Sequence, residues 1–351
     1  MLTGAYEAQA ALAFMQLAIA RAHVALDAAV FQPVPVAGRH SRSKNGVASL
    51  AYAFDRLIHG ATTLNSRDIS YLAVRREQGK VRTGSQSGTV RPPAVAGTFY
   101  PGRPERLQAE LASLLANLAV SADPPPKALI APHAGYIYSG RVAATAFTKL
   151  RERAETITRV VVIGPAHYVP VRGIAVPSAE AFETPLGSVP VDHDALASLA
   201  DLPFVIANDA VHAPEHALEV ELPFLQTLLP SFRIVPLVVG DATPQEVAQV
   251  LRRLWGGPET LIVVSSDLSH FHDYETARRL DGATAAAIER GDWAVLGPKH
   301  ACGHLAVAGL LVETFGHGLK ARRLALCNSG DTAGLPDSVV GYGAWLFAPG
   351  A

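Results

Sequence analysis

Two histidines of this chain occur in nearly the same local setting. His133 lies in the motif APHAGYIYSG and His167 in IGPAHYVPV, and each follows an apolar run and a proline. Neutral imidazole is the commonest nitrogen ligand of transition metals, and small neighbouring residues let an ion approach closely. A histidine that caps a strand or fills the core would show the same pattern. The repetition at two strand ends nevertheless favours a shared metal site.

A cysteine could complete such a site. Cys302, in HACGHLAVAG, begins an apolar helical stretch, and both a helix N-terminus and a nearby cation favour the thiolate. It could also be a small buried hydrophobe, as we expect for Cys327 inside a strand. The two histidines that flank Cys302 could be ligands, although surface positions are the simpler interpretation. We expect His133, His167 and Cys302 to form one mononuclear metal site.

Two further motifs carry acid–base groups. SSDLSHFHD places Asp267 and His270 after a third apolar run. Asp267 could simply cap a turn, whereas His270, with an unperturbed pKa of about 6.5, is a candidate proton-transfer group. PEHALEVELPF places His216 and Glu219 three residues apart, on one face of an expected helix. Acidic residues at a helix start also satisfy the helix dipole without any functional role.

From residue 94 onward, apolar runs alternate with amphipathic stretches, which predicts an α/β domain. The expected strands cover 127–130, 159–163, 173–177, 233–239, 260–264, 322–327 and 339–347. The expected helices cover 104–119, 140–150, 216–229, 244–255, 277–290 and 303–315. Ligands of open α/β sheets bind at the carboxyl ends of strands, so residues that follow three different strands can converge on one site.

Composition excludes several classes of protein. The chain of 351 residues is 49% hydrophobic and has a formal net charge of -1, which gives no whole-chain case for a nucleic-acid partner. Two cysteines are too few for a disulfide framework and favour the reducing cytoplasm. The apolar stretch 10–20 is too short to cross a membrane, so we expect no membrane association. Kinase, NAD and hydrolase-fold functions lack their motifs.

Charge divides the chain into two parts. Residues 1–92 hold 11 Lys or Arg and 5 Asp or Glu, a net charge of +6, and the remainder has a net charge of -7. Basic stretches rich in Gly, Ser or Pro at 32–46 and 75–93 are typical of linkers. We therefore expect residues 1–90 to be an Ala-rich and basic N-terminal extension, partly helical or disordered. A single metal-binding domain should follow over residues 91–350.

Taken together, the motifs resemble those of the Memo family, which in prokaryotes is called AmmeMemoRadiSam system protein B. The similarity covers nearly all of residues 92–348 and none of 1–90. The motifs, in order, are AVAGTFYPG, APHAGYIYSG, GPAHYVP, FETPLG, EHALEVELPF, VPLVVG, SSDLSH and ACGH. The chain departs from many relatives at Tyr168, where they have a second histidine, and at Ala217, where they have serine. Both changes could alter contacts around a substrate.

The Memo family is similar to class III extradiol dioxygenases, so the resemblance implies one three-layer α/β/α domain with a mixed central sheet. Those enzymes hold Fe(II) with two histidines and a carboxylate, and Memo proteins have a cysteine in place of the carboxylate. The resemblance thus implies His133, His167 and Cys302 as the ligands. It matches His270 to the catalytic histidine of the dioxygenases, with Asp267 beside it. The residues expected to line the substrate pocket are His216, Glu219 and Tyr136.

Three functions compete at this stage. The first is a redox metalloenzyme or oxygenase-like protein that acts on a small molecule, with Fe(II) as the expected metal and copper or zinc as alternatives. The second is a metal-binding or scaffold protein without turnover. The third is a zinc hydrolase, because three protein ligands and a water make the usual catalytic zinc site. The prokaryotic family name implies a radical-SAM protein and other AmmeMemoRadiSam system proteins as partners.

Overall fold

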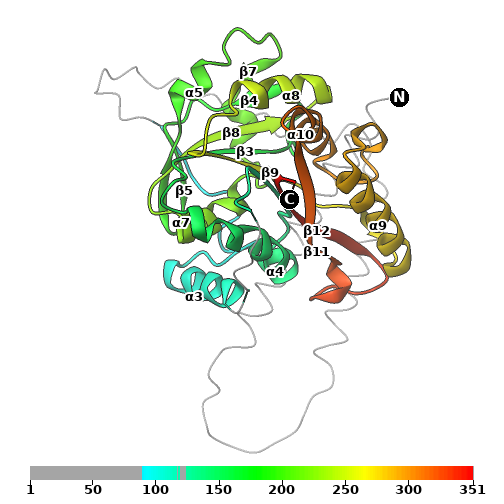
Figure 1. The fold of residues 1–351 in the computed structure, drawn as a ribbon. Coiled ribbons are helices and arrows are strands. Elements are labelled where there is room, and N and C mark those ends of the chain that lie inside the picture. The colour runs from blue at the N-terminus through cyan, green and yellow to red at the C-terminus, as the bar shows by residue number, and fades with distance from the viewer. Residues whose placement is uncertain (1–88, 117, 119–123, 351) are drawn as a thin grey trace, which may run out of the picture. The chain divides into compact units, whose positions relative to one another are not determined.

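The structure is a computed structural model that describes residues 89–116, 118 and 124–350 (Figure 1). The predicted N-terminal extension therefore lies outside the described residues, except for its last two positions. Its helical or disordered character stays a prediction.

Strands and helices alternate through most of the described chain. The strands are β1 (Val90–Arg91), β2 (Ala128–Ala131), β3 (Arg159–Pro165), β4 (Ile174–Val176), β5 (Ala181–Thr184), β6 (Gly187–Pro190), β7 (Val205–Ala207), β8 (Arg233–Val239), β9 (Thr260–Ser265), β10 (His270–His272), β11 (Leu319–Asn328) and β12 (Val339–Pro349). The α-helices are α3 (Pro104–Leu115), α4 (Tyr136–Phe147), α5 (His193–Ala197), α6 (Asp209–His212), α7 (Leu222–Leu228), α8 (Pro244–Arg253), α9 (Tyr274–Arg290) and α10 (His304–Gly316). The 3-10 helices are η3 (Thr148–Arg153), η4 (Glu219–Glu221), η5 (Trp293–Val295) and η6 (Ser329–Asp331).

The main sheet has nine strands and is mixed. Eight strands follow the order β10-β12-β2-β9-β3-β8-β4-β7, and β11 pairs with β12. β2, β9, β3 and β8 are parallel neighbours, and antiparallel strands β12 and β4 flank them. Parallel strands end at the same edge of a sheet, so His133 after β2, His167 after β3 and Asp267 after β9 emerge together. We call this the carboxyl edge.

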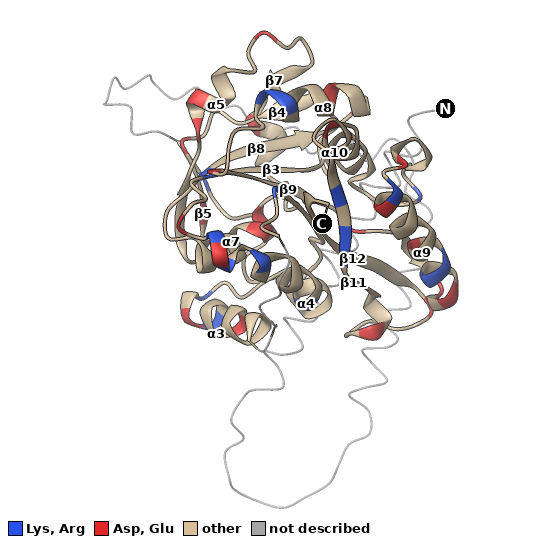
Figure 2. Cartoon of the chain, viewed as in Figure 1, with Lys and Arg blue, Asp and Glu red and all other residues tan. Residues whose placement is uncertain are grey.

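Helices cover both faces of the main sheet. α3, α4 and α7 pack together on one face, and α8 and α10 pack together on the other (Figure 1). The four parallel strands are almost entirely apolar and buried, as strands between two helical layers must be. Figure 2 accordingly shows few charged residues, coloured blue or red, on the central strands. The expected three-layer α/β/α domain with a mixed central sheet is confirmed.

Local sequence explains where helices α8 and α9 begin and where α9 ends. Thr243 and Glu246 form a reciprocal capping box at the start of α8, and Pro244 occupies the first turn, where its missing N–H is tolerated. Asp273 caps the start of α9 by accepting a hydrogen bond from the Thr276 backbone. α9 ends at Gly291, whose φ of 71° favours glycine.

The segment expected to be one helix over 216–229 is different. Residues 213–218 form two turns joined by an irregular stretch at 215–216, η4 follows, and α7 begins only at Leu222. His216 therefore precedes the helix, and the prediction that it shares a helical face with Glu219 is wrong. The reason is local: the Glu215 carboxylate accepts a hydrogen bond from the Ala217 backbone over 2.9 Å, which favours a turn over a helix here.

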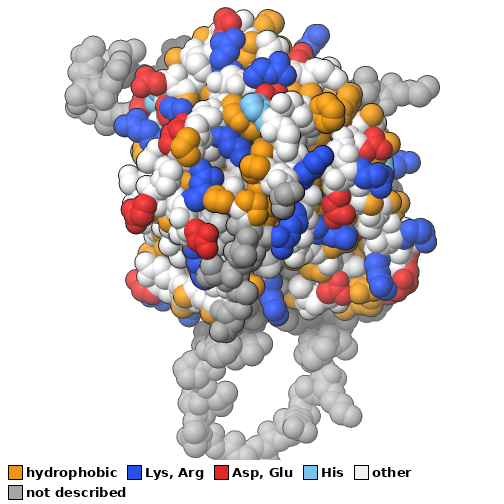
Figure 3. Space-filling model, viewed as in Figure 1, with side chains coloured by type: hydrophobic (Ala, Val, Ile, Leu, Met, Phe, Trp, Pro, Cys, Tyr) orange, Lys and Arg blue, Asp and Glu red, His pale blue; other side chains and the backbone are white. Residues whose placement is uncertain are grey.

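Sequence reasoning also missed a second, smaller sheet, in the order β1-β5-β6. β1 contributes Arg91, which is only 5% exposed although it is charged. On the face shown in Figure 3, acidic, basic and hydrophobic side chains are interspersed. Within the described residues, every helix is too short or too polar to cross a membrane.

Candidate functional site

His133 follows β2 and is almost fully buried. Its backbone N–H donates to Asp267 Oδ1 over 2.9 Å, which ties the ends of β2 and β9 together. Its ring Nδ1 lies 2.7 Å from Ser265 Oγ. The single proton of that hydroxyl is donated to the Ala217 carbonyl over 2.6 Å, so the His133 Nδ1–H must be the donor to Ser265. Nε2 of His133 then keeps a free lone pair, as metal binding requires.

His167 follows β3 and is held by Glu215. Glu215 Oε1 accepts the Nδ1–H of His167 over 2.8 Å. Oε2 of the same carboxylate accepts the backbone N–H of His167 over 2.7 Å. Because the carboxylate occupies Nδ1, Nε2 is again the nitrogen available to a ligand.

A third imidazole, His216, lies against the first two. Its ring stacks on His167 with centroids 4.7 Å apart and meets His133 edge-on at 5.4 Å. One nitrogen from each ring lies within 4.8 Å of the others. Two nitrogens on one zinc ion are at most about 4.2 Å apart, so small ring rotations would let a single ion bridge them. The structure thus places His216, expected in a substrate pocket, among the potential ligands.

Cys302 borders the same cluster. Its Sγ lies 3.3 Å from His133 Nε2. A Cβ at Gly303 would lie 2.8 Å from Ser266, so only glycine lets the chain pass this close to the end of β9. The Cys302 backbone N–H donates to the Asp267 carbonyl over 3.3 Å. The thiol is therefore positioned by the backbone on both sides.

The two predicted acid–base residues also lie at the carboxyl edge. Asp267 is buried, its Oδ2 is 4.0 Å from His133 Nε2, and burial raises its pKa to about 7. Its carboxyl group can therefore exchange a proton near neutral pH. His270 Nδ1 donates to the Leu268 carbonyl over 2.8 Å, which leaves Nε2 as an acceptor. The next residue, Phe271, has a φ of 59°, a strained value for an aromatic residue of the kind found at functional sites.

The pKa values of the neighbouring imidazoles shift in different directions. Burial, reinforced by the charge of His167, lowers the pKa of His133 and takes that of His216 to about 3. Burial also opposes a charge on His167, but Glu215 and the contact with Cys302 outweigh it and raise the pKa of His167. The same pairing outweighs burial at Glu215 and lowers its pKa to about 2. A bound cation would compete with protons for the ring nitrogens of this cluster.

The segment 215–221 connects this cluster to the rest of the domain. Its four polar side chains all have partners from other parts of the chain: Glu215 binds His167, His216 stacks on the same histidine, Glu219 binds Arg91, and Glu221 contacts the Ser265 hydroxyl. Glu221 is fully buried, and burial raises its pKa well above the usual range. Its Oε1 lies 2.9 Å from Ser265 Oγ, which places Glu221 directly behind the hydroxyl that contacts His133.

Glu219 and Tyr136 support this segment from inside the core. The Glu219 carboxylate accepts hydrogen bonds from Arg91, from the backbone N–H groups of residues 94 and 95, and from the Tyr100 hydroxyl. The Tyr136 hydroxyl donates to the Val220 carbonyl over 2.8 Å, and its ring packs against Tyr100. These contacts are structural, and a role for either residue in a substrate pocket stays a prediction.

Sequence reasoning did not assign Glu215, Ser265 or Glu221 to the site. Acidic residues at an expected helix start have an ordinary electrostatic explanation, which hid them. The pattern that could have revealed the two glutamates is three glutamates within seven residues that also contain Ala, Leu and Val. Such a mixture indicates that some of the carboxyl groups are buried and need partners.

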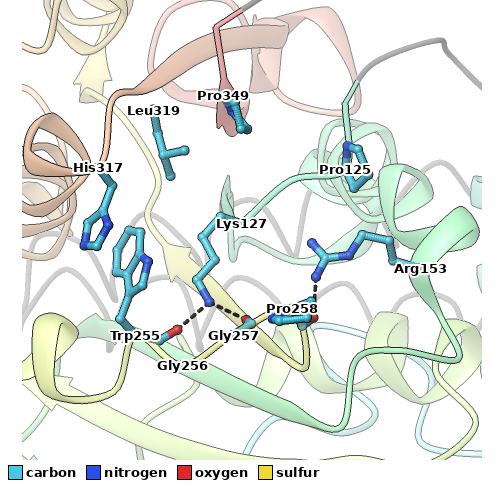
Figure 4. A pocket seen from close by; sticks show the side chains of 10 residues that line it. All are labelled: Pro125, Lys127, Arg153, Trp255, Gly256, Gly257, Pro258, His317, Leu319 and Pro349. Atoms are coloured by element: carbon cyan, nitrogen blue, oxygen red, sulfur yellow. Dashed lines mark hydrogen bonds between the residues drawn. The ribbon is translucent and has the colours of Figure 1, made fainter.

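A pocket lies at the opposite end of the same strands, which we call the amino edge (Figure 4). It has a volume of about 460 Å³ and is lined by Pro125, Lys127, Arg153, Trp255, Gly256, Gly257, Pro258, His317, Leu319 and Pro349. Lys127 donates to the carbonyls of Trp255, Gly257 and Thr260, the last two over 2.9 and 2.8 Å. The Trp255 and His317 rings stack at 4.0 Å. The ammonium group therefore joins loops at the amino edge.

The protein is thus a three-layer α/β/α protein with a candidate single-metal centre. Imidazoles, a thiol and carboxyl groups gather at the carboxyl edge of its central sheet. Comparison with known families gives a match to the family described as Memo-like protein, over residues 91–346. This chain belongs to that family, whose fold is like that of extradiol dioxygenases.

Three curated relatives named as MEMO1 family proteins agree with this assignment. A MEMO1 family protein of Aquifex aeolicus is 36% identical over 270 residues, which cover 74% of this chain and 99% of the relative. A MEMO1 family protein of Methanosarcina mazei is 35% identical over 73% of this chain and 98% of the relative. Another, of Nitrosopumilus maritimus, is 30% identical over 74% of this chain and 99% of the relative. A solved structure of an uncharacterized Escherichia coli K12 protein aligns with a TM-score of 0.41 at 15% identity, covering 62% of this chain and 98% of that one.

Proposed function

We propose that this Memo-like protein binds one transition-metal ion through His133, His167 and Cys302 and acts as an oxygenase-like redox enzyme on a small molecule. One observation carries the proposal: one ring nitrogen each of His133, His167 and His216 lies within 4.8 Å of the others, and the Cys302 sulfur borders this cluster, 3.3 Å from His133 Nε2. Imidazole and thiolate together suit iron, copper and zinc. His216 is a fourth donor within reach.

The residues around this point have separable roles. A redox-active ion held here would supply one-electron chemistry. Ser265 and Glu215 orient the two histidines through Nδ1. His270 Nε2 is a free acceptor and would remove a proton from a bound substrate. Asp267, with a pKa of about 7, would hold and return a proton beside it.

The choice of metal is a separate proposal. Fe(II) is our first choice, because the resemblance to class III extradiol dioxygenases implies it. Copper and zinc are the alternatives, because a thiolate is softer than the carboxylate of those enzymes and favours Cu(I) or zinc.

A second candidate function is metal binding without turnover. The observation that favours it is the burial of His133 and His216, whose imidazoles are kept neutral and therefore ready to bind a soft ion. Under this proposal the protein would sequester iron or copper or act as a scaffold. A zinc hydrolase would use the same ligands with a bound water.

We further propose a reducing compartment, the cytoplasm, because Cys302 and Cys327 are both free thiols. A radical-SAM protein and other AmmeMemoRadiSam system proteins are the proposed protein partners. A small molecule is the proposed substrate.

The test is to purify the protein without oxygen, measure its metal content and follow oxygen consumption with candidate catechols. We expect one ion per chain, consumption of oxygen by the iron-loaded protein, and strong loss of metal in Cys302→Ser. Cys302→Asp should recover Fe(II) binding, because it restores a set of two histidines and a carboxylate. Metal bound equally well by Cys302→Ser would remove the thiol from the site. One ion per chain without oxygen consumption would support the binding function instead.

A further inference from the structure

We infer that Glu215 is the residue that orients His167 for metal binding, by holding its imidazole with Nδ1–H bonded to the carboxylate and Nε2 directed at the ion. This inference rests on the metal site proposed above. It assigns a positioning role to a carboxylate to which the sequence analysis gave no function.

The geometry carries this inference. The two oxygens of Glu215 accept three N–H groups: His167 Nδ1 at 2.8 Å, the His167 backbone at 2.7 Å and the Ala217 backbone at 2.9 Å. Two of these bonds end on the same histidine, one on its ring and one on its main chain. They close a ring of atoms that restricts both side-chain torsions of His167, so a flipped imidazole would lose its carboxylate partner.

Glu215 is itself held in place. Its side chain is buried, and its backbone carbonyl accepts a hydrogen bond from Arg91 Nη2. Arg91 also donates to the carbonyl of His212 over 3.0 Å, so the turn before the cluster is fixed at both ends. A ligand support built on backbone anchors has few alternative positions, and this is what precise metal geometry requires.

The two proposed histidine ligands differ in the partner behind them. Behind His133 stands the Ser265 hydroxyl, which is neutral, with Glu221 beyond it. Behind His167 stands a carboxylate in direct contact. A carboxylate on the far nitrogen raises the basicity of a metal-bound imidazole, and loss of such a partner typically lowers metal affinity about 10–100-fold.

The experiment compares Glu215→Gln and Glu215→Leu with Glu313→Gln. The control breaks a similar pair away from the site, since Glu313 is buried and lies 3.1 Å from His317 Nε2. Zinc affinity is measured by chelator competition. The His167 Nδ1 proton is followed in the metal-free protein by nitrogen-edited NMR, where a buried hydrogen bond to a carboxylate slows its exchange with water. Circular dichroism checks that each variant is folded.

We expect Glu215→Leu to lose the protected ring proton and about 10–100-fold in zinc affinity. Glu215→Gln should keep the ring proton, because its amide oxygen can still accept it, and should lose less affinity. Glu313→Gln should match wild type in both. A folded Glu215→Leu that keeps the ring proton, or binds zinc within twofold of wild type, would overturn the inference. If wild type binds no zinc, the proposed metal site fails, and the ring proton alone still decides whether Glu215 holds His167.

Discussion

The two edges of the main sheet use polar residues in opposite ways. At the amino edge, Lys127 donates to three backbone carbonyls and Arg153 donates to the carbonyls of Pro126 and Pro258, so the charges join loops. At the carboxyl edge and directly behind it, several buried polar atoms of the described chain lack a hydrogen-bond partner: His216 Nδ1, Glu221 Oε2, Ser269 Oγ and Asp281 Oδ2. Buried polar groups are normally satisfied, so these four exceptions at and behind the candidate metal site call for an explanation other than stability. At the amino edge, by contrast, Lys127 and Arg153 are fully engaged in joining loops.

The strongest test of this contrast removes one histidine from each edge. His167→Ala should abolish stoichiometric metal binding, with a loss above the roughly 100-fold upper range for residues that only support a ligand. His317→Ala removes a similarly sized ring that stacks on Trp255 at the amino edge, and should leave metal affinity unchanged. Metal analysis after dialysis measures both. Equal losses in the two variants would mean that the edges do not differ in this way.

Within the carboxyl edge, His270 should separate chemistry from binding. Its Nδ1 is bound to the Leu268 carbonyl and its Nε2 is free, so His270→Ala should keep the metal and lower any turnover by about 10²–10⁴-fold. Steady-state rates on metal-matched samples measure the effect. Loss of the ion from this variant would move His270 into the ligand set.

At the amino edge, the expected effect is on stability. Lys127→Met keeps an unbranched side chain but removes the donor of three carbonyls. Those of Trp255 and Thr260 are partly buried, and leaving a buried group unsatisfied costs about 1–3 kcal/mol. Urea denaturation should therefore show a lower free energy of unfolding, at unchanged metal affinity. A change in affinity without a change in stability would reverse the roles of the two edges.

The smallest effect concerns Asp281, which lies behind the carboxyl edge. Its Oδ1 accepts the Ser269 backbone N–H over 3.0 Å, while burial raises its pKa from 3.8 to about 6. The folded protein thus keeps this proton to higher pH than the unfolded chain. The contribution of Asp281 to the free energy of unfolding should therefore fall as pH rises from about 4 to 6, and stay lower above that range.

Asp281→Asn should remove this pH-dependent loss. We expect the variant to be about 1–2 kcal/mol more stable than wild type at pH 8. A shift of about two pKa units, at about 1.4 kcal/mol per unit, would give more, but the amide is also buried and this offsets part of the gain. At pH 4 the two proteins should differ little. Thermal and urea unfolding at both pH values measure this, and a difference in stability between variant and wild type that is the same at pH 4 and pH 8 would contradict it.

The sequence predicted the residues at the carboxyl edge better than the residues that hold them in place. His133, His167 and Asp267 could be found because each follows a buried apolar strand, and parallel strands bring such positions together. The lateral order β2-β9-β3 could not be deduced, because nothing local encodes which strands pair. The partners of Glu215 and Glu219 were equally hidden, because they lie 48 and 128 residues away in the sequence, at His167 and Arg91. Pairings across such separations leave no periodic trace.

The buried pair of Arg91 and Glu219 has a consequence for shortening the chain. Arg91 enters from the two-residue strand β1, yet it binds the Glu219 carboxylate and two of the carbonyls that shape the turn before His216. A shortened protein that begins at Ala94 would keep every residue of the candidate site and every strand of the main sheet. It would also leave Glu219 buried without its counter-charge, a defect that commonly costs 3–5 kcal/mol. The smallest useful fragment of this protein is therefore set by a salt bridge, and its first residue must precede Arg91.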